Sequence, residues 1–128
     1  MTFDQRPKTR LTNATKANEV IATDVRFAET FFQRAFGLMG KKPLPQGEAL
    51  MFKGTRLMPC NSIQTTFMRF SLDLLFLDTE MKVKAIQRDV KPWRVTWPVG
   101  GAVNAIEMNA GALASARIEI GDQLHVGN

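Results

Sequence analysis

Apolar residues gather along most of the chain in short runs, which are separated by stretches rich in Gly, Pro, Asp, Asn and Thr. Short apolar or alternating runs between turn-forming residues are typical of strands. The pattern predicts strands over residues 9–14, 19–23, 49–52, 62–67, 72–77, 83–87 and 103–108, and two short segments, 118–120 and 123–126, around the turn Gly121–Asp122. The run 72–77 is the strongest of these, and with 83–87 it predicts a hairpin.

Between Phe27 and Gly37 the period of the apolar positions changes to that of a helix. The positions that share one helical face are Phe27, Ala28, Phe31, Phe32, Ala35 and Phe36. Asp24 can cap the first turn through its side-chain oxygen, and Gly37 can end the helix in a left-handed conformation. We expect one amphipathic helix of about three turns here, and one short helical or irregular turn over residues 110–116.

These elements predict a mainly β (α+β) fold, in the form of a compact barrel-like or folded sheet of about seven or eight short strands. A length of 128 residues is usual for a single domain. Residues 1–8 are polar and charged, so we expect a flexible N-terminal tail followed by one globular domain over residues 9–128.

No apolar run approaches the roughly 18 residues that a membrane span needs, so we expect no membrane span. The N-terminal residues also lack the apolar core of a secretory signal. The chain as given is therefore expected to be cytoplasmic, although a leader that had been removed would leave no trace in it.

The chain has a single cysteine, Cys60, and a single histidine, His125. An intramolecular disulfide is therefore impossible, and a zinc site with four Cys or His ligands cannot be assembled. Nothing in the positions of these two residues favours a nucleophilic Cys–His pair. Four methionines lie near aromatic residues, as in core packing rather than a copper site: Met39, Met51, Met58 and Met68. We expect no metal and no cofactor.

Charge and motif content narrow the function classes. The formal net charge is +5, and basic residues gather at the start of the chain and in the stretch 82–94. Such a surface can attract nucleic acid. Because these runs lack interleaved aromatic residues, we interpret them as a solvated face and keep weak nucleic-acid binding as a third hypothesis.

The chain lacks a phosphate loop, a dinucleotide fingerprint and a nucleophile elbow, which disfavours nucleotide-dependent enzymes and common hydrolases.

Asp73 is the most informative single residue, because it interrupts the apolar run 72–77. In a strand it shares one face with Leu75 and Leu77, and the other face is apolar as well. A buried carboxylate needs a cation or several hydrogen-bond donors. Asp73 is therefore either a structural carboxylate or an anchor or acid/base group in a site.

Glu107 poses the same question in the predicted strand 103–108. If Glu107 faces inward, Arg34 or Arg69 is its candidate partner, because a guanidinium can bind a carboxylate in bidentate fashion. Asp73 and Glu107 could also form a carboxylate pair for hydrolytic chemistry, if the distance between them allows it.

Trp93 and Trp97 lie four residues apart in the proline-rich segment 91–101, which is expected to be a long loop. They either cover the core or form an aromatic platform for a sugar or a peptide. The polar run that begins at Gln64 can line a pocket or form the solvent face of a strand.

Four blocks stand out in order along the chain: Arg34-Ala-Phe-Gly-Leu-Met39, Gly47 to Phe52, Phe67-Met68 with Leu72 to Asp78, and Ala105-Ile-Glu-Met108 with Gly111 and Gly121-Asp122. Their order and spacing resemble those of a bacterial and archaeal family, the domain of unknown function 192. The resemblance runs from about residue 22 to residue 126 and covers most of the chain. Many members carry a histidine where this chain has Gln64.

The resemblance implies a compact, mainly β fold with a short helix, and it implies no settled activity. Members often follow a leader or a lipid anchor, and some are fused to membrane parts of secretion or pilus machinery. This implies a link to the cell envelope by association alone.

We expect a monomeric, non-enzymatic binding or accessory module for a small ligand or peptide. The site would form where the loops 37–47 and 91–101 meet the end of the Asp73 strand. Its candidate residues are Arg34, Gln64, Asp73, Trp93, Trp97 and Glu107. The rival hypothesis is a small hydrolase or lyase that uses Asp73 and Glu107 as acid and base.

Overall fold

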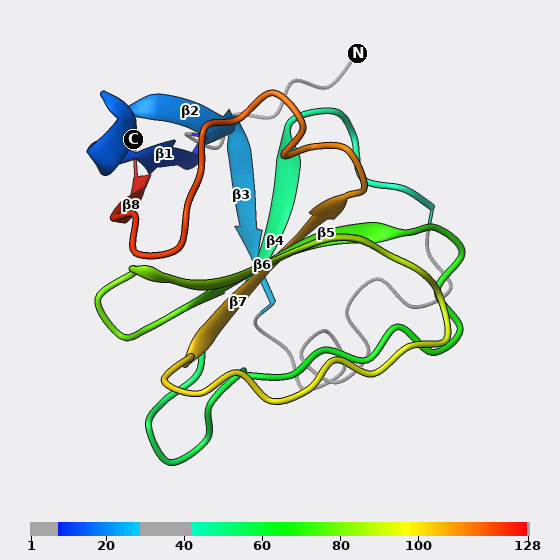
Figure 1. Ribbon diagram of the computed structural model, residues 1–128. Helices are drawn as coiled ribbons and strands as arrows, with labels where there is room; N and C mark the ends of the chain where they lie inside the picture. The colour runs from blue at the N-terminus through cyan, green and yellow to red at the C-terminus, as the bar shows by residue number, and fades with distance from the viewer. Residues whose placement is uncertain (1–7, 29–41, 128) are drawn as a thin grey trace.

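The computed structural model describes residues 8–28 and 42–127, which form eight strands and one short 3-10 turn (Figure 1). The strands are β1 (Arg10–Asn13), β2 (Glu19–Ala22), β3 (Asp24–Phe27), β4 (Glu48–Phe52), β5 (Leu72–Leu77), β6 (Val83–Val90), β7 (Asn104–Asn109) and β8 (Leu124–Gly127). The turn η1 (Ala14–Lys16) follows β1. The predicted mainly β class is confirmed. No helix in this part of the chain has the length and apolar character to cross a membrane.

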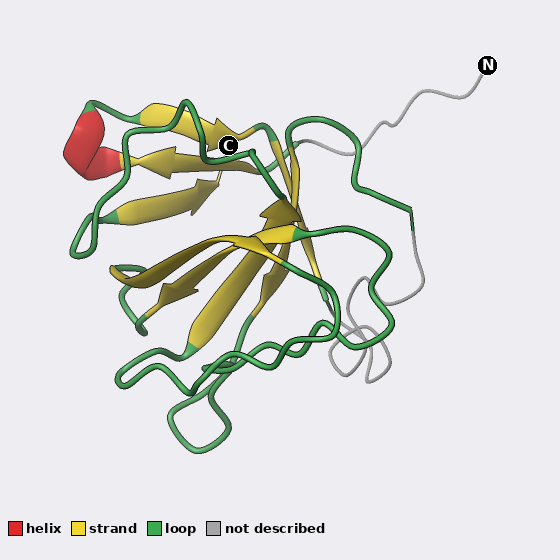
Figure 2. Cartoon of the chain, turned by 45° about the vertical axis from the view of Figure 1, so that its right-hand side comes forward, coloured by secondary structure: helices red, strands yellow, loops and turns green. Residues whose placement is uncertain are grey.

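The strands form two separate sheets that pack one above the other (Figures 1 and 2). The smaller sheet has the order β2-β1-β8, and the larger has the order β3-β4-β7-β5-β6. Every neighbouring pair is antiparallel except β3 and β4, which are parallel. Of the two predicted forms, a barrel-like or a folded sheet, the barrel-like form is wrong, because the larger sheet ends in two edge strands, β3 and β6, that do not pair with each other.

Apolar side chains cover both faces of the larger sheet. The inter-sheet core lies between the two sheets and includes Met51, Leu75, Leu77, Ile106, Met108 and Leu124. The outer core lies on the opposite face and includes Phe52, Leu72, Leu74, Phe76 and Ala105. All six residues of β5 are buried. Burial on both faces explains why this strand has a continuous apolar run rather than an alternating one.

The predicted amphipathic helix is not supported. Asp24 and Phe27, its expected cap and first apolar residue, instead form β3, in register with Glu48 and Met51 of β4. Pairing with a buried strand outweighs the local preference of an aspartate for a cap, because strand formation depends on its partners. From residue 29 to residue 41 the prediction lies outside the described residues, as does nearly all of the predicted tail.

Two shorter predicted strands are wrong. Segment 62–67 is not a strand and makes only one isolated bridge, between Gln64 and Val95. Segment 118–120 is irregular. Segment 110–116 takes the irregular of its two predicted forms, a series of turns, because the N–H groups of Gly111 and Leu113 bond to a side chain instead of to preceding carbonyls.

Candidate functional site

Asp73 lies in β5 with its carboxylate fully buried and hydrogen-bonded by the chain itself. Its Oδ1 accepts a hydrogen bond from the Asp89 N–H at 2.9 Å, and its Oδ2 accepts from the N–H groups of Gly111 and Leu113, both at 3.0 Å. Asp89 sits at a register shift in β6, with a left-handed φ of 54°. The carboxylate therefore joins β5 to a bulge in β6 and to the turns after β7, which is the geometry of a structural group.

Glu107 is buried in the middle of β7, between Leu50 of β4 and Leu74 of β5. The residue is 4% exposed, and its Oε2 has no hydrogen-bond partner among the described residues. Burial raises the pKa of this carboxyl from 4.5 to about 8. Arg69 forms no ion pair with it within the described chain, and Arg34 lies outside the described residues. A pKa raised this far keeps the Glu107 carboxyl mainly protonated at pH 7.

The two carboxyl groups lie on opposite faces of the larger sheet. Asp73 is in register with Met108, which belongs to the inter-sheet core. Glu107 is in register with Leu74, which belongs to the outer core. A carboxylate pair for hydrolysis must flank the same scissile bond, so both groups must line one cleft. The sheet between them therefore prevents Asp73 and Glu107 from acting as a joint acid and base.

Segments 61–67 and 91–99 run antiparallel to one another and form what we term the paired loop. Its backbone hydrogen bonds include Thr65 N–H to the Arg94 carbonyl at 2.7 Å and Thr96 N–H to the Ile63 carbonyl at 2.9 Å. The paired loop covers the outer core, to which it contributes Ile63. Irregular backbone can lie over a core in this way because its polar groups are satisfied across the pair.

Four large apolar side chains of the paired loop point into solvent, and we term them the aromatic ridge. They are Phe67, Trp93, Val95 and Trp97, with exposed fractions of 59%, 59%, 71% and 87%. Phe67 and Trp93 contact each other edge to face, with ring centroids 4.6 Å apart and an interplanar angle of 64°. The paired loop therefore exposes four large apolar side chains, two of them in contact, and exposed apolar surface of this kind marks interaction sites.

The backbone under the aromatic ridge is strained and locked. Phe67 and Trp93 have left-handed φ values of 60° and 63°, which are uncommon for aromatic residues. Buried Thr65 fixes this conformation: its hydroxyl donates to the Lys91 carbonyl at 2.7 Å and accepts from the Arg94 N–H at 2.8 Å. Such strain costs about 1–3 kcal/mol per residue and clusters at functional sites. The fold thus holds these rings on the surface at an energetic cost.

The structure brings together three of the six predicted site residues. Trp93, Trp97 and exposed Gln64 all lie in the paired loop, where Gln64 bridges to Val95. Asp73 lies on the other face of the sheet, and Glu107 is buried in its middle. Sequence reasoning missed Phe67, although its position directly after the polar run 64–66 could have suggested an exposed ring.

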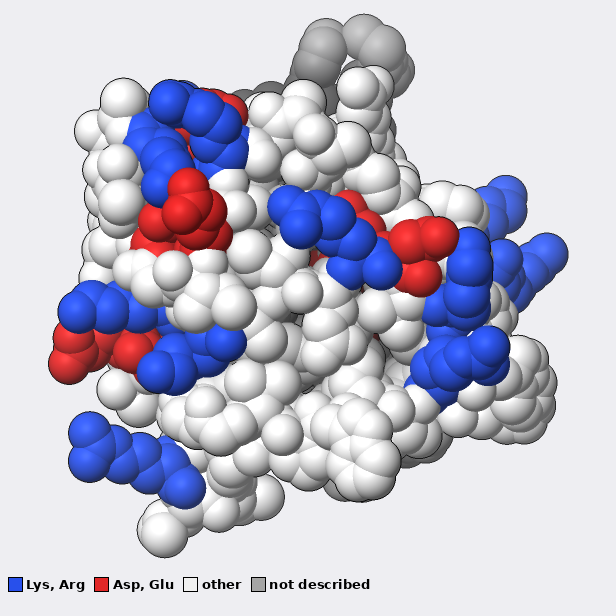
Figure 3. All heavy atoms as spheres, in the orientation of Figure 1, with Lys and Arg blue, Asp and Glu red and all other residues white. Residues whose placement is uncertain are grey.

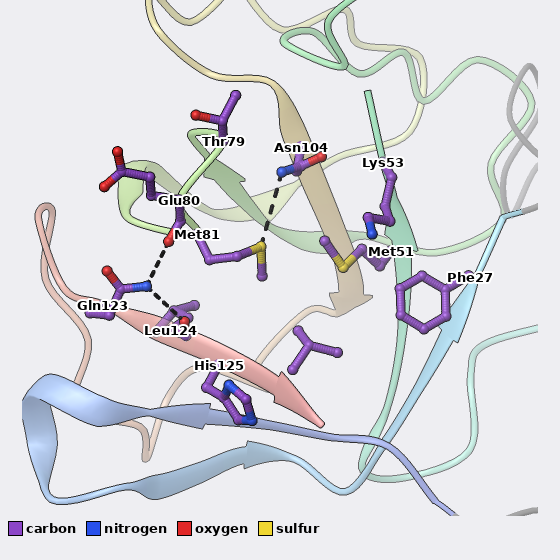
Figure 4. Close-up of a pocket in the computed structure, with 11 residues that line it drawn as sticks. Phe27, Met51, Lys53, Thr79, Glu80, Met81, Asn104, Gln123, Leu124 and His125 are labelled. Atoms are coloured by element: carbon purple, nitrogen blue, oxygen red, sulfur yellow. Dashed lines mark hydrogen bonds between the residues drawn. The ribbon is translucent and has the colours of Figure 1, made fainter. Parts of the chain in front are cut away.

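A pocket opens at one end of the gap between the two sheets (Figure 4), and we term it the inter-sheet pocket. It has a volume of about 370 Å³. Its apolar lining consists of Phe27, Met51, Met81, Leu124 and Val126. The polar residues that line it are Lys53, Thr79, Glu80, Asn104, Gln123 and His125. Small-molecule sites also combine apolar walls with polar groups, and this volume is at the lower end of their range.

The His125 side chain does not make the inter-sheet pocket a metal site. Figure 4 shows its ring on the side of β8 away from Met51 and Met81. It packs against Gly127, where an added Cβ would lie 2.7 Å from Nε2. Among residues 8–28 and 42–127, no group of three His, Cys, Asp or Glu side chains could hold a metal ion.

The fold and these surfaces define a small two-sheet β domain with an exposed aromatic surface and an inter-sheet pocket. The chain belongs to the DUF192 family, described as "Uncharacterized ACR", whose model matches residues 12–126. This confirms the family that the sequence blocks resemble.

Named relatives support the same family assignment, and solved structures share the fold. A UPF0127 protein of Pyrococcus horikoshii is 37% identical over 101 residues, which cover 79% of this chain and 85% of the relative. A UPF0127 protein of Pyrococcus furiosus is 34% identical, with 88% and 93% covered. The crystal structure of a protein of unknown function from Novosphingobium aromaticivorans has a TM-score of 0.74 at 22% identity, covering 91% of this chain and 82% of the other.

A putative transcription regulator from Sinorhizobium meliloti has a TM-score of 0.72 at 24% identity, with 92% of this chain and 91% of the other covered. At these identities the two solved structures show a shared fold. The function of the family is uncharacterized.

Proposed function

We propose that this protein is a non-enzymatic binding module that captures an extended, proline-rich peptide on the aromatic ridge. The observation that carries the proposal is the exposure of Phe67, Trp93, Val95 and Trp97 on a strained backbone that Thr65 locks. Exposing this apolar surface to water is unfavourable, so a partner that covers it would gain binding free energy. Because the loop is already ordered, binding would not lose the conformational entropy of ordering it.

The shape of the aromatic ridge favours a peptide over a sugar. A sugar ring stacks on one flat, open ring face and needs fixed polar side chains beside it. Here Phe67 and Trp93 meet at 64°, which gives a notched surface, and the nearby Gln64 side chain already accepts a hydrogen bond from the Thr66 N–H at 3.3 Å. Notches between aromatic rings are the features that bind a polyproline II helix.

The polar groups around the aromatic ridge fit a peptide that also carries acidic residues. The indole N–H groups of Trp93 and Trp97 can donate hydrogen bonds to peptide carbonyls. Arg94 lies between the two tryptophans and is exposed. In Figure 3, the uncharged surface at the bottom of the molecule, where the paired loop runs in Figure 1, has Lys and Arg on both sides. Acidic residues in the peptide would therefore be attracted to the flanks.

Replacing Trp97 by alanine is expected to weaken binding of a synthetic peptide of repeated Pro-Pro-Glu triplets by roughly 30-fold or more, because buried tryptophans dominate such interfaces. Titration of the peptide followed by tryptophan fluorescence and calorimetry measures this. Ile120→Ala is the matched control, because Ile120 is 70% exposed but lies in the turn before β8 rather than in the paired loop.

Two alternative probes complete the experiment. If the Pro-Pro-Glu peptide fails to bind, or binds equally well to the Trp97→Ala and Ile120→Ala variants, the proposal is wrong. Binding of a xylose or glucose oligomer to the same surface, without peptide binding, would show that the ligand of the aromatic ridge is a sugar and not a peptide. Binding of oligothymidylate that weakens steeply with salt and depends on Trp97 would make the module a nucleic-acid binder.

A further inference from the structure

Asn104 places a poorly used hydrogen-bond donor at the inter-sheet pocket. The residue is 6% exposed, its Oδ1 accepts from the Gly54 N–H at 3.1 Å, and its Nδ2 donates to the Asp78 carbonyl at 3.1 Å. The other contact of Nδ2 is with the Met81 thioether sulfur, at 4.0 Å, inside the pocket (Figure 4). A thioether is a weak acceptor. A ligand oxygen would be a better partner for this buried amide group than the sulfur is.

Lys53 brings a positive charge to the same pocket. Figure 4 shows its side chain running from the end of β4 toward Met51. An ammonium group has three N–H donors, so Lys53 can bind a ligand in addition to its contacts within the chain. By contrast, Gln123 already donates twice through Nε2, to the Glu80 carbonyl at 2.6 Å and to the Leu124 carbonyl at 3.0 Å. The donors directed at a ligand are therefore those of Asn104 and Lys53.

The remaining surface of the inter-sheet pocket suits an apolar chain. Met51 and Met81 point into it, and Phe27, Leu124 and Val126 complete its walls. Thioether side chains are flexible and polarizable and adapt to apolar ligands of different shape. The carboxylate of Glu80, which would repel an anion, is at the outer edge and points away from the methionines in Figure 4.

We infer that the inter-sheet pocket binds a small carboxylate with an apolar body, such as a medium-chain fatty acid. The carboxylate accepts hydrogen bonds from Lys53 Nζ and Asn104 Nδ2, and the hydrocarbon chain packs against Met51, Met81 and Leu124. This site is independent of the proposed peptide site, because it lies in the gap between the sheets and the aromatic ridge lies over the outer core.

Octanoate and its neutral isostere octanamide test this inference on the chain of 128 residues. Octanoate is expected to bind with a dissociation constant on the order of 1 mM or below. Amide shifts in heteronuclear NMR spectra should concentrate at residues 51–53, 79–81 and 123–126. Lys53→Met should weaken octanoate binding about five-fold or more and leave octanamide binding nearly unchanged. Lys82→Met, which removes an exposed lysine outside the pocket lining, is the matched control.

A second variant tests the location separately from the charge. Val126→Phe should fill part of the pocket and weaken both octanoate and octanamide, while the Trp97-dependent peptide binding stays as in the unmodified protein. Shifts that are absent, or spread over the aromatic ridge instead, would overturn the inference. An equal loss of octanoate binding in Lys53→Met and Lys82→Met would also overturn the inference, because the loss would then come from the change in net charge and not from the position of Lys53.

Discussion

Replacing Asp73 by asparagine is expected to lower the free energy of unfolding by about 1–3 kcal/mol. The carboxylate accepts three backbone hydrogen bonds, from Asp89, Gly111 and Leu113. An asparagine has one carbonyl oxygen and one NH₂ group in the same volume, so at least one backbone N–H would face another donor. Urea denaturation followed by circular dichroism at neutral pH measures the change.

Asp89→Asn is the matched control for Asp73→Asn. The Asp89 carboxylate pairs with Lys91 at 2.8 Å, and both side chains are 59% exposed. Exposed pairs of this kind contribute little, so the control should change stability by less than about 1 kcal/mol. Amide hydrogen exchange at Gly111 and Leu113 should accelerate only in Asp73→Asn. If stability and exchange are unchanged, Asp73 does not have the structural role that its hydrogen bonds indicate.

The same variant separates the structural interpretation of Asp73 from the ligand-anchor interpretation. Asp73 lies on the inter-sheet face, and the aromatic ridge lies over the opposite one. Folded Asp73→Asn protein is therefore expected to bind the Pro-Pro-Glu peptide with unchanged affinity. A loss of peptide affinity in fully folded protein would favour the anchor.

Much of the larger sheet could be predicted from the chain because its strands have simple apolar patterns. The predicted strand 72–77 has the same first and last residues as β5, and the predicted strand 49–52 differs from β4 by one residue. β3 was missed because Phe27 and Ala28 continue the period of the apolar residues that follow them. Its strand conformation comes from pairing with β4, which is distant in sequence, and local periodicity does not contain that information.

The candidate site shows the same limit. Alternation within each strand places Asp73 and Glu107 on defined faces of their own strands. Whether those faces coincide depends on the register of β5 against β7, which pairs Asp73 with Met108 rather than with Glu107. A shift of one residue would have put both carboxyl groups on one face. Pattern alone could therefore propose the carboxylate pair but could not exclude it.

The sequence left open whether Trp93 and Trp97 cover the core or form an exposed platform. In the structure Ile63 covers the core, while Phe67 and Trp93 turn outward. The deciding feature is the left-handed backbone of both residues, held by the Thr65 hydroxyl across the paired loop. Hydrogen bonds between segments about 30 residues apart leave no local pattern in the sequence.

Glu107 gives the fold a pH dependence of unusual sign for a carboxyl group. Its folded pKa is raised to about 8, against 4.5 for the usual value, because it is buried without a described partner for Oε2. Below about pH 4.5 the carboxyl group is protonated in both the folded and the unfolded state, so its ionisation does not change the free energy of unfolding. Between pH 4.5 and 8 the unfolded chain releases the proton and the folded chain keeps it, so stability falls as pH rises.

Replacing Glu107 by glutamine is therefore expected to stabilise the protein increasingly as the pH rises from 5 to 8. The difference in unfolding free energy between the variant and the unmodified protein should grow by at most about 1.4 kcal/mol per pH unit, and level off above pH 8. Urea denaturation at each pH measures it, with the exposed Glu80→Gln as control. A constant difference across this range would mean that the pKa of Glu107 in the folded state is not raised above its ordinary value, and that a neighbouring charge stabilises its ionised form.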